Sequence, residues 1–102
     1  MIDGLIAGRI SGHPEQRSGQ GGTQYVTCKV KAMTDDGDTI ICNVIGFNDK
    51  VRATLLGLND GESIALSGAL TPKVWTDKQG NVRPAIDLVA HAIVSNASDR
   101  ME

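Results

Sequence analysis

The chain has 102 residues, a mass of 10.8 kDa and a formal net charge of −2. This length fits one domain. The charge excludes a protein that attracts polyanions through its overall field, so any nucleic-acid site must be a local basic surface. Only three residues are aromatic, which leaves the core to aliphatic side chains and makes the positions of Tyr25, Phe47 and Trp75 informative.

Cys28 and Cys42 have neither a Cys-x-x-Cys spacing nor a His cluster beside them. We therefore expect buried core thiols and no metal or other cofactor. No N-terminal targeting signal is visible, and no apolar run approaches the ~18 residues of a membrane span. The expected location is the cytoplasm, with no membrane partner.

The first half of the chain predicts three strands. Residues 4–12 form the first, and the Gly- and Pro-rich residues 13–22 are expected to form a loop. Residues 23–33 alternate, so that Val26 points inward while Lys29 points outward. A hairpin turn centred on Asp36-Gly37 leads into residues 39–47, whose two faces are both apolar. The outward Ile41, Ile45 and Phe47 therefore predict either an oligomer interface or a binding surface.

In the second half, the spacing of apolar residues changes from the two-residue period of a strand to that of a helix. Val51, Leu55 and Leu58 share a helical stripe, with Asn48 or Asp49 as its cap and Gly61 closing the stretch. Residues 62–71 and 83–94 then predict two more strands, joined by the hairpin that carries Trp75.

Five short strands with a single helix between the third and fourth predict an all-β OB-fold, a five-stranded Greek-key barrel. An SH3-like barrel normally lacks a helix at that position, and a ferredoxin-like fold needs two. We expect the barrel to occupy residues 1–94 and residues 95–102 to form a short polar tail.

Trp75 is the first candidate binding residue. A core position is the ordinary one for a tryptophan, but Trp75 shares its strand parity with Lys73, opposite to the inward Leu70. We therefore expect an outward indole beside a turn and among cations. Such an indole suits either base stacking or the docking of a partner protein.

The other candidates are aromatic or basic. Phe47 is expected either to stack a base or to pack on the helix, and Tyr25 either to form a second platform or to sit half-buried in its strand. Lys29, Lys31, Lys73 and Arg83 are expected to line one track for phosphates, with affinity falling as salt rises. Arg9 and Ile41 complete the set. No Ser-His-acid, Cys-His or phosphate-loop pattern is present in the sequence, so an enzyme is not expected.

Two segments carry a resemblance to a known family. The sequence "LIAGRISGHPEQR" at residues 5–17 and "GALTPKVWTDKQGNVR" at residues 68–83 resemble bacterial single-stranded DNA-binding proteins, and the stretch between Phe47 and Gly68 aligns without a gap. The resemblance covers about residues 2–94. It implies an OB-fold that binds single-stranded DNA without sequence preference and assembles as a homo-oligomer, a dimer or a tetramer. It also implies stacking by Trp75 and Phe47, with Lys73 and Arg83 near the DNA.

The chain departs from the family at several positions. Ile41 occupies a position where the family often has a tryptophan. A second family tryptophan, near the turn after the second strand, is also missing, and Asp35 lies near its position. Asn59 and Asp60 replace a commonly lysine-rich helix exit, and the acidic, Phe-ended tail is not found. We therefore expect weaker DNA binding and no tail-mediated recruitment of repair enzymes.

The sequence thus predicts a non-enzymatic protein of DNA replication, recombination or repair that protects single strands and is nucleoid-associated when bound. One alternative is a primosomal OB protein of the PriB type, in which contacts with partner proteins matter as much as DNA. Another is an OB protein-interaction module with little DNA binding.

Overall fold

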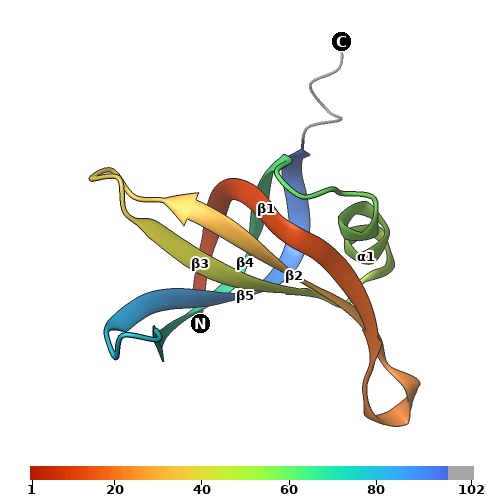
Figure 1. Ribbon diagram of the computed structural model, residues 1–102. Helices are drawn as coiled ribbons and strands as arrows, with labels where there is room; N and C mark the ends of the chain where they lie inside the picture. Colours follow the sequence, from red (N-terminus) through yellow and green to blue (C-terminus); the bar gives the residue numbers. More distant parts are fainter. Residues whose placement is uncertain (97–102) are drawn as a thin grey trace.

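A computed structural model describes residues 1–96 of the chain. Its five strands close into a barrel in the order β1-β2-β3-β5-β4 (Figure 1). The strands are β1 (Ile2–Ser18), β2 (Gln24–Met33), β3 (Thr39–Gly46), β4 (Ser63–Thr76) and β5 (Val82–Asn96), and α1 (Asp49–Leu56) lies between β3 and β4. All neighbouring strands pair antiparallel except β3 and β5, which are parallel. The predicted all-β OB-fold with one short helix is confirmed.

The barrel interior is aliphatic, as the composition predicts. Leu55, Leu66 and Leu88 are fully buried, and each contributes about 1.5–3 kcal/mol by leaving water. Cys28 and Cys42 are also buried, as free thiols. Burial raises the pKa of Cys28 to about 12 and that of Cys42 to about 11, with smaller contributions from Cys42 and Asp87 respectively. The predicted core thiols are confirmed.

Helix α1 packs against the barrel through the predicted apolar stripe, with Val51 and Leu55 buried. Asn48 is the N-cap, and its side-chain oxygen accepts a hydrogen bond from the Val51 amide at 2.8 Å. The helix ends at Leu56 with Gly57 as its C-cap, earlier than the predicted Gly61. Gly61 has a φ of 89° and donates its amide to the Ile10 carbonyl at 2.8 Å, so it ties the following loop to β1.

The predicted loop over residues 13–22 is wrong for its first part. Strand β1 continues to Ser18 and pairs Arg17 with Tyr25 on β2. The register shifts between Ser11 and Glu15, where Gly12 has a φ of 81°. The Gly and Pro residues therefore mark a bulge inside a strand rather than its end. Only the single 3-10 turn at Gln20–Gly22 and its neighbours leave the sheet.

The β4–β5 hairpin is longer than predicted, since β4 runs on through Trp75 to Thr76 and β5 begins at Val82. At the far end β5 continues to Asn96, two residues past the expected barrel boundary. Residues 97–102, most of the expected tail, lie outside the described residues. The hairpin turn at Asp36-Gly37 is confirmed, because the Gly37 amide donates to the Thr34 carbonyl at 3.0 Å. In the described part of the chain, no helix is long and apolar enough to cross a membrane.

Candidate nucleic-acid interface

Two adjoining hollows cross the outer face of the barrel. The larger has a volume of about 750 Å³ and reaches Arg17, near the end of β1, where β1 pairs with the start of β2. The smaller, about 590 Å³, ends at Trp75 on β4. We call the two together the cross-barrel groove; the residues that they share form its middle and are Ser11, Lys29, Asn43, Lys73 and Asp87.

The strand register explains why these side chains meet. Neighbouring strands place one outward residue each in a continuous row across the whole barrel, which reads Ser11, Lys29, Asn43, Asp87 and Thr71. Directly paired residues on one sheet face lie about 5 Å apart, so polar side chains in such a row contact one another. The groove is therefore built from all five strands, and its polar middle is fixed by sheet pairing rather than by loops.

Trp75 lies at the β4 end of the groove with 45% of its surface exposed. Its pairing partner across the hairpin is Arg83, so the indole and the guanidinium share one face. The predicted outward orientation of Trp75 is confirmed. Lys73 and Ile41 line the same hollow.

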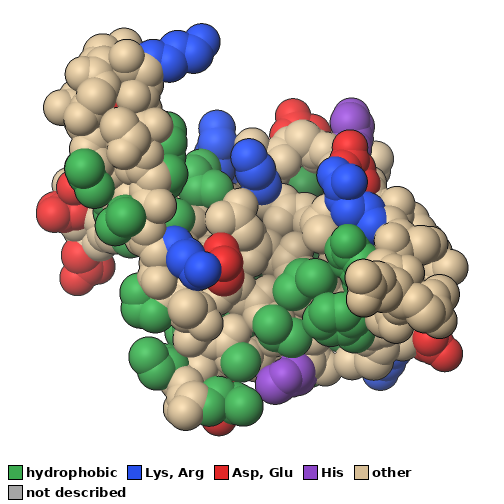
Figure 2. Space-filling model, turned by 90° about the horizontal axis from the view of Figure 1, so that it is seen from below, with side chains coloured by type: hydrophobic (Ala, Val, Ile, Leu, Met, Phe, Trp, Pro, Cys, Tyr) green, Lys and Arg blue, Asp and Glu red, His purple; other side chains and the backbone are tan. Residues whose placement is uncertain are grey.

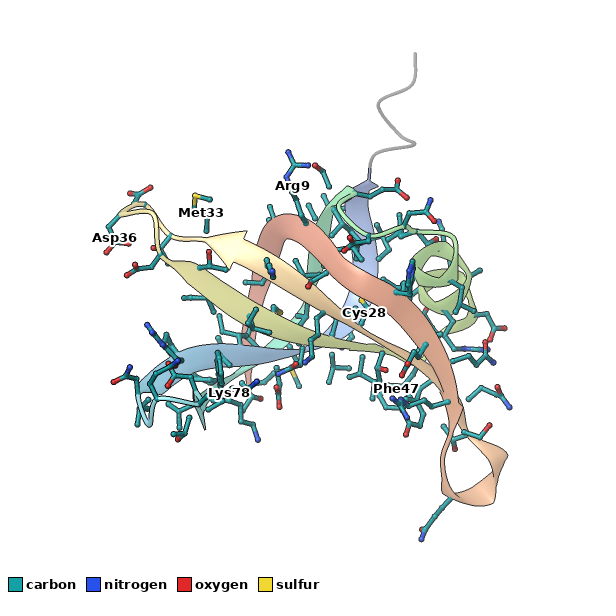
Figure 3. The ribbon with its side chains drawn as sticks, viewed as in Figure 1. Arg9, Cys28, Met33, Asp36, Phe47 and Lys78 are labelled. Atoms are coloured by element: carbon teal, nitrogen blue, oxygen red, sulfur yellow. The ribbon has the colours of Figure 1, made fainter. Side chains whose placement is uncertain are left out.

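Tyr25 and Phe47 form a second aromatic group, with ring centroids 5.9 Å apart and planes tilted by 47°. Phe47 is exposed and Tyr25 half-buried. Neither ring lines the groove, but Ile45, two residues before Phe47 on the same side of its strand, does. Figure 3 places Phe47 on the lower side of the barrel, at the opposite end from Lys78 on the β4–β5 hairpin. The pair thus continues the groove beyond its larger hollow.

Not all of the predicted cations gather at the groove. Lys29 and Lys73 line it, and Lys31 follows Lys29 on the same face of β2. Arg9 pairs with Lys31 in the sheet, but its guanidinium donates to the Gly61 carbonyl at 3.1 Å. In Figure 3 Arg9 lies on the upper side of the barrel, away from Phe47.

Acidic partners hold two of the candidate cations. The Lys73 ammonium lies 3.6 Å from a carboxylate oxygen of Asp87, and Arg83 Nε lies 3.0 Å from Oδ2 of Asp77. Figure 2 shows the molecule from below, with Lys and Arg side chains around a hollowed middle and several of them beside Asp or Glu side chains. Among the described side chains, Lys29 and Lys31 have no carboxylate within ion-pair distance. Phosphates would meet these two lysines without displacing an acid.

The middle of the groove contains three residues that were not predicted from the sequence, Ser11, Asn43 and Asp87. Asp87 is the only charged residue in the apolar stretch from Pro84 to Ala90, so strand parity alone marks it as outward-facing. Asn43 has the same strand parity as Ile41, so it too could have been predicted to face outward. Arg17 lines the larger hollow and pairs with Glu15, but it falls in the segment expected to be a loop.

No family model matches the sequence, and neither does any curated protein. The fold is similar to the crystal structure of a small single-stranded DNA-binding protein from Streptomyces coelicolor, with a TM-score of 0.72, 17% identity and 96% of each chain covered. It is also similar to Rim1, a mitochondrial single-stranded DNA-binding protein of S. cerevisiae. One Rim1 structure gives a TM-score of 0.64 at 19% identity, covering 90% of this chain and 91% of that one. Another gives 0.67 at 18% identity, covering 94% and 97%. The chain therefore has the OB-fold that these single-stranded DNA-binding proteins have.

Proposed function

We propose that this protein binds single-stranded DNA through base stacking and phosphate contacts, without requiring a particular sequence. The observation that carries the proposal is Trp75, a large and partly exposed aromatic surface at the end of a groove that crosses all five strands. The similarity to single-stranded DNA-binding proteins over nearly the whole chain supports the same function.

The groove suits a strand whose bases face the barrel. A base stacked on an aromatic ring gains roughly 1–3 kcal/mol whatever its identity, because every base has a π-face. Trp75 offers one platform, and the exposed edge of the Tyr25–Phe47 pair offers another beyond the larger hollow. Lys29 and Lys31 are placed to neutralise phosphates directly. Lys73 and Arg83 can do so once they leave their carboxylate partners.

The proposed biological role is the protection of exposed single strands during replication, recombination or repair. In this role the protein binds DNA and catalyses no reaction. We propose that it acts as a homo-oligomer of two or four copies. Its proposed location is the cytoplasm, where it associates with nucleoid DNA. The outward Ile41 and Ile45 line the groove, which supports a place for them in the DNA surface.

Comparing single-stranded with duplex DNA tests the proposal. A labelled mixed-sequence oligonucleotide is titrated at low salt and followed by fluorescence anisotropy, alone and after annealing to its complement. We expect the single strand to bind more tightly, because duplex bases cannot splay out onto Trp75. Equal affinity for the two forms, or no binding of either, would contradict the proposal.

A second candidate function is protein interaction, favoured by the apolar edge of the β4–β5 hairpin. Val74 and Val82 are 71% and 67% exposed there, on either side of the turn. Exposed valines on a projecting hairpin suit a protein contact better than a phosphate backbone. In the titration above this function predicts that neither form of DNA binds.

A further inference from the structure

An acidic residue lies in the middle of the cross-barrel groove. Asp87 is at the junction of the two hollows, and 44% of its side chain is exposed. A carboxylate at this position repels phosphates, so it works against simple neutralisation of a DNA backbone. Its presence between Lys29 and Lys73, two of the cations that line the groove, suggests a purpose other than affinity.

The neighbours of Asp87 leave most of its hydrogen-bonding capacity free. Its Oδ1 accepts a hydrogen bond from Nδ2 of Asn43 at 3.2 Å, and the Lys73 ammonium is 3.6 Å from Oδ2, beyond ordinary hydrogen-bond length. An ionised carboxylate has about four acceptor sites. Among the described residues, the amide oxygen of Asn43 accepts no hydrogen bond. The middle of the groove therefore presents exposed acceptors, held in place by the β3–β5 pairing of Asn43 with Asp87.

Hydrogen-bond acceptors of this kind select bases by their donors. Guanine carries an N1–H and an N2 amino group side by side on its Watson–Crick edge, which match the two oxygens of one carboxylate. Cytosine and adenine each offer one exocyclic amino group, and carboxylates accept from cytosine N4 in known base contacts. Thymine has a single N3–H between two carbonyl oxygens, which a carboxylate repels. Unpaired bases in a single-stranded site expose these edges.

Trp75 and Asp87 line the same smaller hollow. A DNA strand lying there would thus place one base against an aromatic surface and another, farther along, beside a pair of acceptors. We propose that Asp87, positioned by Asn43, hydrogen-bonds the amino groups of bases in the groove and gives the protein a preference for guanine over thymine. This inference rests on the proposed single-stranded DNA binding and adds a base preference to it. Engagement of Asp87 by a base also releases Lys73 for a phosphate.

Three oligonucleotides of equal length test the inference: alternating thymine–guanine, alternating thymine–inosine, and oligo-dT. Inosine is the matched probe, because it stacks as a purine but lacks the N2 amino group of guanine. We expect the guanine oligonucleotide to bind about tenfold more tightly than oligo-dT, the effect of one good bidentate contact. The inosine oligonucleotide should bind more weakly than the guanine one, because it keeps N1–H but loses the N2 donor.

Two variants complete the design. Asp87→Asn keeps the side-chain shape but loses the charged bidentate acceptor, so the guanine preference should fall to within about twofold. Glu15→Gln removes another carboxylate that lines the groove and is bound to Arg17, and this control should keep the preference.

The outcomes separate the explanations. If wild-type protein binds the guanine and inosine oligonucleotides equally, the inference is overturned, and that comparison does not depend on how any variant folds. If Asp87→Asn strengthens binding to all three oligonucleotides by the same factor, Asp87 only repels phosphates and the inference is again wrong. If wild-type protein binds none of them at low salt, the proposed DNA binding itself fails.

Discussion

At the scale of single residues, the orientation of one indole decides whether the proposed base stacking is possible. Trp75 is exposed because β4 runs past Leu70 beyond the core, and its regular pairing with β5 puts the indole on the strand face opposite to Leu70. The strand face of Trp75 could be deduced from the sequence alone. The partners of the neighbouring cations could not, because the pairing of Lys73 with Asp87 depends on the register between β4 and β5.

Replacing Trp75 with alanine should weaken single-stranded DNA binding by roughly 1–3 kcal/mol, the value of one stacked base. Because 45% of the residue is exposed, the variant should still fold. Binding is measured by anisotropy and stability by urea denaturation. Val82→Ala is the matched control, since it removes an exposed apolar side chain from the same hairpin, outside both hollows, without removing an aromatic one. Unfolding of the Trp75 variant would show that the indole belongs to the core.

The two buried thiols should be unreactive in the folded protein. With pKa values raised to about 12 for Cys28 and about 11 for Cys42, only about one molecule in a thousand or fewer carries a thiolate at pH 8. A thiol reagent at that pH should label neither cysteine in buffer and both in denaturant. Rapid labelling of native protein would contradict the buried placement of the thiols.

At the scale of elements, the strands and the helix follow from periodicity, but their ends do not. Alternation identifies β2 because one face meets the core and the other meets water. The segment after Gly12 was expected to leave the sheet, since Gly and Pro commonly end strands. It stays in the sheet because a bulge accommodates them. A single sequence does not distinguish these two uses of glycine and proline.

Gly68 should tolerate no side chain. A Cβ atom there would lie 2.0 Å from the Val89 carbonyl oxygen, a clash with backbone at the irregular part of the β4–β5 pairing. Gly68→Ala should destabilise the protein by about 2 kcal/mol or more, seen as a lower urea midpoint. Gly57→Ala is the control, because its Cβ would lie 3.6 Å from the nearest atom and its backbone is helical. Similar midpoints for the two variants would contradict this packing.

The β4–β5 turn should lose order in acid. The pKa of Asp77 is lowered chiefly by the hydrogen bond from the Asn81 amide, with further contributions from Arg83 and the Gln79 amide. A lowered folded-state pKa means that this stabilisation is complete above the ordinary value of 3.8 and is lost as pH falls below it. The protection factors of the Gln79 and Asn81 amides, which correct for the intrinsic pH dependence of exchange, should fall below that pH in wild-type protein. In the Asp77→Asn variant, which has no carboxyl group to titrate at this position, amide protection should no longer change with pH in this range. If the variant shows the same pH dependence as wild-type protein, another group causes the effect.

At the scale of the whole molecule, the charges should set the strength of the proposed DNA binding. Twelve acidic residues outnumber ten basic ones, and acids stand beside Lys73 and Arg83 in the groove region. Exposed ion pairs of this kind are worth about 0–1 kcal/mol, so DNA can displace them at modest cost. The composition correctly excluded a strongly basic protein, but it gave no sign of an acid at the centre of the groove.

The most direct test of the central claim is to follow the fluorescence of the single tryptophan while oligo-dT is added, at low and at physiological salt. Stacking on Trp75 predicts strong quenching at low salt, and phosphate contacts predict that the binding curve shifts to weaker affinity as salt rises. Absence of both quenching and salt-dependent binding at low salt would contradict the claim that this barrel binds single-stranded DNA.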